Sequence, residues 1–199
     1  MPTYRQWTPP VETPIAAIHG WVDDISSAHE LARRLVQEAE RESADLLVVD
    51  ALSAAAVVRY CRCFSSGIRQ RLRIDELPSA SAADIAFHER IRRVRDRHVA
   101  HPVNQQEVHA LYLMVDESPG ATTAALGISS QASSLFALDS HEAQELVALC
   151  EKWIKHLRKR LAEENLRLMP LVQRLSREEL LALPQGEPQA NSDVDLKRT

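Results

Sequence analysis

The stretch DLLVVDALSAAAVVRYCRCF, residues 45–64, decides the class of fold. Its residues favour a helix that is apolar on nearly every side at its start. Such a helix must be buried, either by other helices of the same chain or by a second copy of the chain. The pattern predicts this helix over roughly residues 45–72, at the centre of a helical protein.

The composition agrees with a mainly α protein. The chain has 199 residues with only 5 glycines, and its 45% hydrophobic and 26% charged residues are ordinary for one soluble domain. No apolar run approaches a membrane span, and the first residues lack the pattern of a signal peptide. Three cysteines make an odd count without metal-type spacing, which argues against a disulfide framework. We therefore expect a cytoplasmic protein with no membrane partner.

Further helices are expected on both sides of this segment. A proline-rich, irregular N-terminal arm over residues 1–22 precedes a helix that begins near Asp24, where Ser27 and Glu30 have capping-box spacing. Another helix is predicted from Ser81 or Ala82 to residue 102, where a proline ends it.

Later in the chain, Asp139 and Glu142 have the spacing of a capping box for a long helix that ends or kinks at Pro170. Ser176 and Glu179 have the same spacing before a short helix.

The segment EVHALYLMVDES alternates well enough to be a strand. SPG follows as a turn, and ATTAALGISSQASSLFAL can supply the return strand, which predicts a β-hairpin over about 107–138. Residues 184–199 are polar and aperiodic, and are expected to be disordered. The predicted fold is thus an up-and-down helical bundle over 23–183 with a small β-hairpin insertion.

Several classes of site are excluded by their missing motifs. The chain has no Gly-x-Ser-x-Gly, no phosphate-binding loop and no Gly-x-Gly-x-x-Gly. His98 and His101 lie on one helix face, but no third metal ligand accompanies them, and no histidine follows a glutamate at Glu-x-x-His spacing. We expect neither a metal nor another cofactor.

Arginines are concentrated in two segments. Of the 24 basic residues 20 are arginine; residues 59–73 hold five without an acid, and residues 88–101 hold five more against two acids. Arginine suits bidentate phosphate contacts, although the net charge of −4 argues against a protein that coats nucleic acid. The arginines expected to contact RNA are Arg59, Arg62, Arg90 and Arg93.

Arg95-Asp96-Arg97-His98-Val99-Ala100-His101 resembles the Arg-polar-x-His signature of HEPN domains, with Asp96 at the polar position. The resemblance implies a homodimeric helical bundle whose two motifs face each other. Many such proteins are metal-independent endoribonucleases of toxin–antitoxin, phage-defence or CRISPR systems. It implies Arg95 and His101 as catalytic residues, supported by Asp96, Arg97 and His98. The expected substrate is RNA, and an antitoxin or a nucleotidyltransferase is an expected partner.

Two alternatives stay open at this point. On an ideal helix Arg95 and His101 point about 120° apart, whereas Arg97 lies about 40° from His101. The pairing of Arg95 requires either distortion before Pro102 or an arginine from the other chain. Alternatively, the histidines continue the apolar stripe of Phe87 and its helix neighbours, and the protein is a non-catalytic helical dimer that binds a protein or a nucleic acid.

Overall fold

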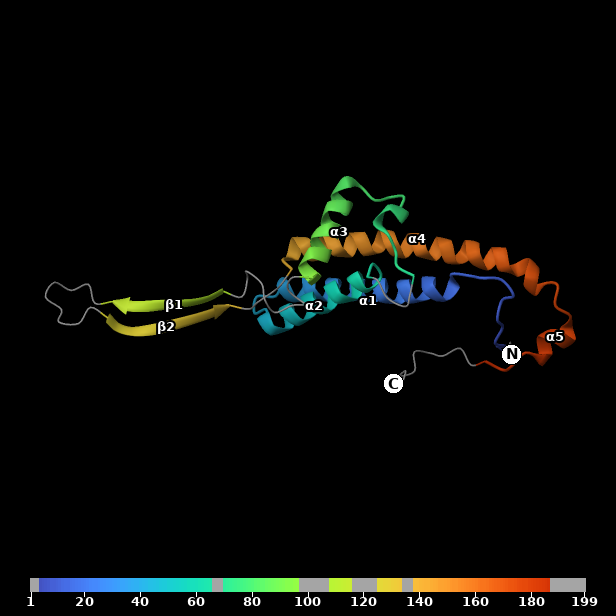
Figure 1. The fold of residues 1–199 in the computed structure, drawn as a ribbon, viewed down its shortest axis with the longest axis horizontal. Coiled ribbons are helices and arrows are strands. Elements are labelled where there is room, and N and C mark those ends of the chain that lie inside the picture. Colours follow the sequence, from blue (N-terminus) through green and yellow to red (C-terminus); the bar gives the residue numbers. More distant parts are fainter. Residues whose placement is uncertain (1–3, 66–69, 97–107, 116–124, 134–137, 187–199) are drawn as a thin grey trace.

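The structure is a computed structural model that describes residues 4–65, 70–96, 108–115, 125–133 and 138–186. It is a helical bundle from which a two-stranded hairpin projects, which confirms the predicted mainly α fold with a small hairpin (Figure 1). The elements are α1 (Ile15–Ala39), α2 (Leu46–Arg62), a 3₁₀ turn (Ile74–Glu76), α3 (Ala82–Val94), β1 (Val108–Val115), β2 (Ala125–Ser133), α4 (Ser140–Val172) and α5 (Arg177–Ala182).

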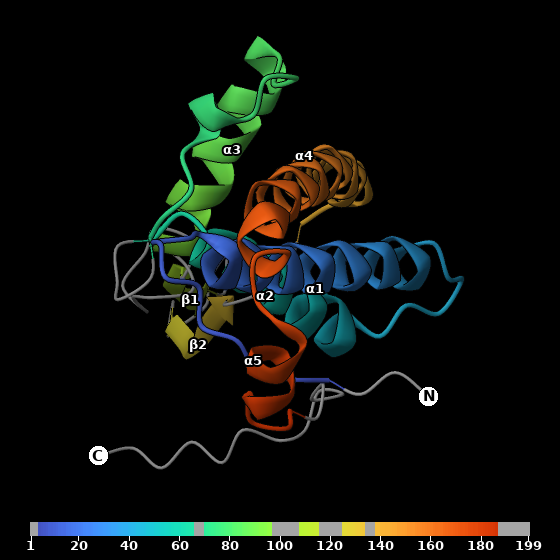
Figure 2. The same ribbon diagram turned by 90° about the vertical axis from the view of Figure 1, so that its right-hand side faces the viewer.

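Helix α1 is the centre of the bundle and packs against both α2 and α4 (Figures 1 and 2). It begins at Ile15, so the prediction of an irregular arm over 1–22 extends too far, and Ser27–Glu30 lies inside the helix instead of capping it. The reason is that Ile18 and Trp21 continue the buried face of the helix toward its N-terminus, and burial of that face outweighs the local capping pattern.

Helix α2 starts where expected but ends early. The Asp45 carboxylate accepts hydrogen bonds from the first amides of the helix, including that of Leu47 at 2.9 Å. The helix ends at Arg62, and the prediction that it reaches residue 72 is wrong. The amide of Leu72 instead donates to the carbonyl of Cys63 at 2.8 Å, which brings residues 70–72 back beside the end of the helix.

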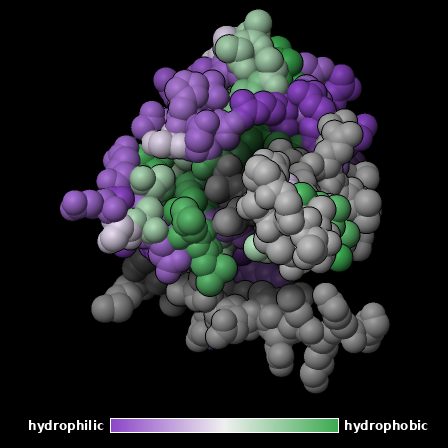
Figure 3. All heavy atoms as spheres, turned by 90° about the vertical axis from the view of Figure 1, so that its left-hand side faces the viewer, coloured by the Kyte–Doolittle hydropathy of each residue, from purple (hydrophilic) through white to green (hydrophobic). Residues whose placement is uncertain are grey.

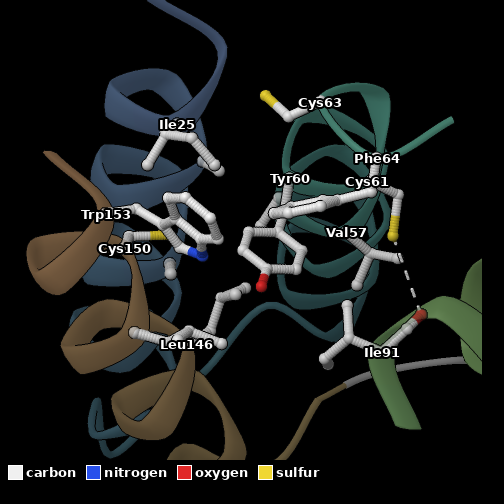
Figure 4. Close-up of a cluster of buried hydrophobic side chains, with 14 of the residues drawn as sticks. Ile25, Val57, Tyr60, Cys61, Cys63, Phe64, Ile91, Leu146, Cys150 and Trp153 are labelled. Carbon is white, nitrogen blue, oxygen red and sulfur yellow. Dashed lines mark hydrogen bonds between the residues drawn. The ribbon is translucent and has the colours of Figure 1, made fainter. Parts of the chain in front are cut away.

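The core joins α1, α2, α3 and α4 around an aromatic cluster (Figure 4). The ring of Phe64 lies 4.9 Å from Tyr60, 4.5 Å from His88 and 5.5 Å from Trp153, measured between ring centroids. These four side chains come from α2, the residues just after it, α3 and α4, so the cluster connects three helices. The three cysteines are buried and free, consistent with the absence of a disulfide framework.

A buried hydroxyl connects α2 to the segment that enters α4. The Ser53 hydroxyl donates to the carbonyl of Val49 at 2.8 Å and accepts from the amide of Leu138 at 3.1 Å. Ser53 is fully buried and Leu138 nearly so, and water therefore does not substitute for this bond. The bond fixes where the chain re-enters the bundle after the hairpin.

The caps predicted for the later helices are confirmed. At the start of α4, the Asp139 carboxylate accepts from the amide of Glu142 at 2.8 Å, and the Glu142 carboxylate accepts from the amide of Asp139 at 3.0 Å. Ser176 and Glu179 form the same reciprocal pair before α5. Helix α4 continues past Pro170 to Val172.

The two ends of the chain meet beyond α5. The amide of Gln6 donates to the carbonyl of Pro184 at 2.9 Å, and the amide of Gly186 donates to the carbonyl of Tyr4 at 3.1 Å. Residues 184–186 are therefore ordered, contrary to the prediction of a disordered tail from 184, and the rest of that tail lies outside the described residues.

Strands β1 and β2 form an antiparallel hairpin in the predicted position, with Val108 opposite Ser133 and an irregularity between Met114 and Val115. The hairpin extends away from the end of the bundle (Figure 1). Among the helices that the structure describes, none is long and apolar enough to span a membrane.

Substituting Ser53 by alanine should lower the free energy of unfolding by about 1–3 kcal/mol, because the buried amide of Leu138 loses its acceptor. Urea unfolding followed by circular dichroism measures this. Ser27→Ala, on the less buried side of α1, is the control and should change stability by less than about 0.5 kcal/mol. Equal stability of wild type and Ser53→Ala would contradict the role given to this hydroxyl.

Candidate functional site

A polar groove lies between the end of α2, residues 70–76 and the end of α3. It consists of a hollow of about 140 Å³ that contains Arg95 and a wider one of about 470 Å³ beside it. Phe64, Arg71 and Arg92 line both. We call the two hollows together the arginine groove, because they are lined by Arg71, Arg73, Arg92 and Arg95.

The groove has its shape because α3 is held against α2 by buried contacts. The Tyr60 hydroxyl and Nδ1 of His88 share a hydrogen bond of 2.8 Å. Sγ of Cys61 lies 3.9 Å from the carbonyl of Ile91, which is fully buried (Figure 4). Ile91 precedes Arg92 and lies one helical turn before Arg95. Fixing Ile91 therefore fixes the positions from which both arginines reach the groove.

The charges in the groove are only partly balanced. Nη1 of Arg95 lies 2.7 Å from the Asp96 carboxylate, Nη2 of Arg73 lies 2.6 Å from Asp75, and Arg92 has a looser contact with Glu89 at 3.7 Å. Arg71 is exposed, and no carboxylate in the described parts of the chain pairs with it. This guanidinium is available to an anionic ligand, and a phosphate or a carboxylate fits its bidentate geometry.

Two of the residues predicted as the catalytic group can be placed. Arg95 and Asp96 directly follow α3 and lie together in the groove. Arg97, His98 and His101 lie outside the described residues. Which arginine pairs with His101 therefore stays a prediction.

The arginines predicted to contact RNA are not in this groove. Arg59 and Arg62 both reach the buried carboxylate of Asp24 on α1, with N–O distances of 3.0 and 3.6 Å. These ion pairs connect α2 to α1. The two guanidinium groups that the prediction assigned to phosphate are therefore paired with a carboxylate of the same chain.

Arg90 forms an ion pair with Glu142 of α4 and connects α3 to that helix. Arg93 is exposed on α3 and has no ion pair with the described residues.

Sequence reasoning missed Arg71, Arg73 and Arg92 as members of the site. A signal for them was present, because Arg71 and Arg73 belong to the arginine-rich run 59–73 and Arg92 lies three residues before Arg95. What could not be seen is that the chain turns back after α2, which brings residues 70–73 beside α3.

His88, Cys61 and Tyr60 lie beneath the groove, and burial keeps all three side chains uncharged. Burial lowers the pKa of His88 to about 4, so this imidazole is neutral at physiological pH. Burial also raises the pKa of the Cys61 thiol to about 12, which removes it as a nucleophile, and raises the pKa of Tyr60. No cluster of three metal-binding side chains occurs within the described ranges. Proton transfer in this groove would need a group other than these.

No protein-family model, curated protein or solved structure matches the chain.

The buried His88 makes stability depend on pH in a defined window. The unfolded chain binds a proton at this residue near pH 6.5, whereas the folded chain binds it only near pH 4, so protons favour unfolding between these values. Between pH 7 and 4.5 the wild type should lose about 2 kcal/mol more of its unfolding free energy than His88→Gln does. Urea unfolding at several pH values measures the difference.

The exposed His141→Gln variant is the control, and its pH dependence should follow that of the wild type. If His88→Gln also follows the wild type, the imidazole is not held neutral by burial.

Proposed function

We propose that this chain is a HEPN-like endoribonuclease that cleaves RNA without a metal ion, with Arg95 and His101 as its catalytic pair. The observation that supports this most directly is that Arg95 lines a groove with three further arginines, one of which, Arg71, has no carboxylate partner in the described chain. A groove of this kind suits the phosphates of a single RNA strand.

The arginines of the groove would act in different ways. Arg71 and Arg92 bind backbone phosphates, which places the strand along α3. Arg95, oriented by its 2.7 Å contact with Asp96, donates to the oxygens of the scissile phosphate, where negative charge increases in the transition state. Since the guanidinium keeps its charge at all physiological pH values, it supplies this stabilisation without a metal.

His101 would transfer the proton. It takes the proton of the 2′-hydroxyl, whose oxygen attacks the adjacent phosphorus. The bond to the 5′-oxygen breaks, and that oxygen takes a proton from water as it leaves. The products are a 2′,3′-cyclic phosphate and a 5′-hydroxyl. Histidine is suited to this step because it titrates near neutrality. Arg97 and His98 support the pair in this proposal.

The biological setting proposed is a cytoplasmic homodimer of a toxin–antitoxin or phage-defence system, with an antitoxin or a nucleotidyltransferase as its partner. The resemblance of residues 95–101 to the HEPN signature is the support for this assignment.

A second candidate is a non-catalytic helical dimer that binds a protein or a nucleic acid. Two observations favour it: Arg59, Arg62 and Arg90 are used in ion pairs within the bundle, and the imidazole beneath the groove, His88, is buried and neutral. In this case the arginine groove binds the ligand and no bond is broken.

Purified protein should cut mixed cellular RNA in the presence of EDTA, and Arg95→Ala and His101→Ala should each slow cutting by at least about 100-fold. Arg174→Ala, an exposed arginine beyond α4, is the matched control and should cut like wild type. Gel electrophoresis of end-labelled RNA measures the rates, and the end groups of the products identify the cyclic phosphate.

Cutting that survives in both Arg95→Ala and His101→Ala would contradict the proposed site. If folded wild-type protein binds RNA in a manner that depends on Arg71 but cuts none, the second candidate is correct.

A further inference from the structure

Strand β1 carries a row of large apolar side chains that nothing in the described chain covers. Leu111, Leu113 and Val115 are exposed to 78%, 67% and 52%. Because side chains alternate along a strand, these three lie on one face of the hairpin, and the cross-strand partner of Leu113 is Ile128, which is 72% exposed. Tyr112, on the other face, is also exposed. We call residues 111–115 with Ile128 the apolar arm.

An arm of this kind is not expected to stand alone in water. A two-stranded hairpin is marginally stable unless it packs against something, and isolated edges are normally protected by lysine or proline. Residues 108–115 and 125–133 contain no Lys, Arg, Asp, Glu or Pro. The absence of charge also makes RNA an unsuitable cover for the arm.

A second uncovered apolar surface lies at the start of α2. Leu46, Leu47 and Val48 are exposed to 62%, 75% and 40%, whereas Val57, farther along the helix, is fully buried. We call these three exposed residues the α2 patch. They belong to the segment whose apolar pattern requires burial either by the same chain or by a second copy, and the bundle covers only the later part of it. The α2 patch and the base of the hairpin lie at the same end of the molecule, where apolar surface gathers (Figures 1 and 3).

We propose that a second copy of this chain covers both surfaces, with the apolar arm of each copy lying on the α2 patch of the other. The arm extends away from its own bundle, so it does not cover its own α2 patch (Figure 1). A twofold axis between two copies allows both contacts to form at once, and each chain then has its arm and its patch buried.

The size of these surfaces matches a dimer interface. With roughly 170 Å² for each fully exposed large apolar side chain, the α2 patch and the one face of the arm that carries Leu113 and Ile128 together expose roughly 750 Å² per chain. A stable protein interface buries about 800 Å² per partner, and homodimer interfaces are the more apolar ones. An uncharged arm and an aliphatic patch have this character.

The inference specifies the interface of the dimer invoked in the proposed function, but its evidence is apolar exposure and not nuclease chemistry. It is tested by mass in solution, and a failure of RNA cleavage leaves it intact.

Light scattering after size-exclusion chromatography should give wild-type protein a mass near twice the 22.4 kDa of the chain at micromolar concentration. Leu47→Lys and Leu113→Glu should each give a monomer, because each places a charge in both apolar contacts. Leu166→Glu, at a 72% exposed position of α4, is the matched control and should remain a dimer. Both altered residues are exposed, and circular dichroism will verify that the variants are folded.

A mixing experiment identifies which surfaces meet. If the Leu47→Lys and Leu113→Glu proteins are combined, a mixed pair has one wild-type contact and one in which lysine faces glutamate, so dimers should reappear. A contact of arm with arm, or of patch with patch, gives no such recovery. A wild-type monomer, a dimer that survives Leu47→Lys or Leu113→Glu, or a mixture that stays monomeric would each overturn the proposal.

Discussion

The buried aromatic cluster of Tyr60, Phe64, His88 and Trp153 is the interaction on which the rest of the structure depends. It connects α2, α3 and α4 through ring contacts, and it contains the hydrogen bond between the Tyr60 hydroxyl and His88. Since α3 has few other contacts with α2, this cluster determines where the end of α3 lies. The position of Arg95, and therefore the arginine groove, follows from it. The same burial that holds α3 in place also keeps His88 neutral, so the imidazole serves the fold and not the chemistry.

Helix α2 has different surroundings along its length, and this difference connects the two proposals. Its later part is buried by the bundle and forms one wall of the groove near Cys61. Its first turn, around Leu47, is apolar but uncovered. An exposed apolar turn costs solubility unless a partner covers it, and the apolar arm at the same end of the molecule has the same requirement. A dimer would thus bury the apolar first turn of α2, which the single chain leaves exposed.

Much of the fold could be predicted from the sequence because it depends on local interactions. The capping boxes at Asp139 and Ser176 and the apolar, strand-favouring run of β1 involve residues close together in the chain. Capping patterns did not locate the start of α1. Ser27 and Glu30 have the spacing of a capping box but lie inside the helix, because its earlier turns are stabilised by burial against the rest of the bundle. Of the residues that line the arginine groove, only Arg95 and Asp96 were among those predicted from the sequence. Whether an arginine faces solvent or a buried acid depends on distant residues.

Arg59 and Arg62 illustrate that limit. Their partner Asp24 lies on another helix, and no local pattern in either segment reveals the contact. Arg71 is the converse case: the chain reversal after α2 places it beside α3, and in the described parts of the chain no carboxylate forms an ion pair with it. Of the four arginines predicted to contact RNA, Arg59, Arg62 and Arg90 form ion pairs within the bundle, whereas Arg93 has none with the described residues.

The most direct test of the account is a titration of the protein with a non-cleavable 2′-O-methyl RNA strand, followed by the arginine Nε–H signals in nuclear magnetic resonance spectra. The signals of Arg71, Arg92 and Arg95 should shift together and saturate, and added salt should reverse the shifts, because phosphate contacts release counterions. Arg158, exposed on α4, should not respond. Shifts at Arg158 without shifts at the three groove arginines, or no shifts at all, would show that the groove is not where RNA binds.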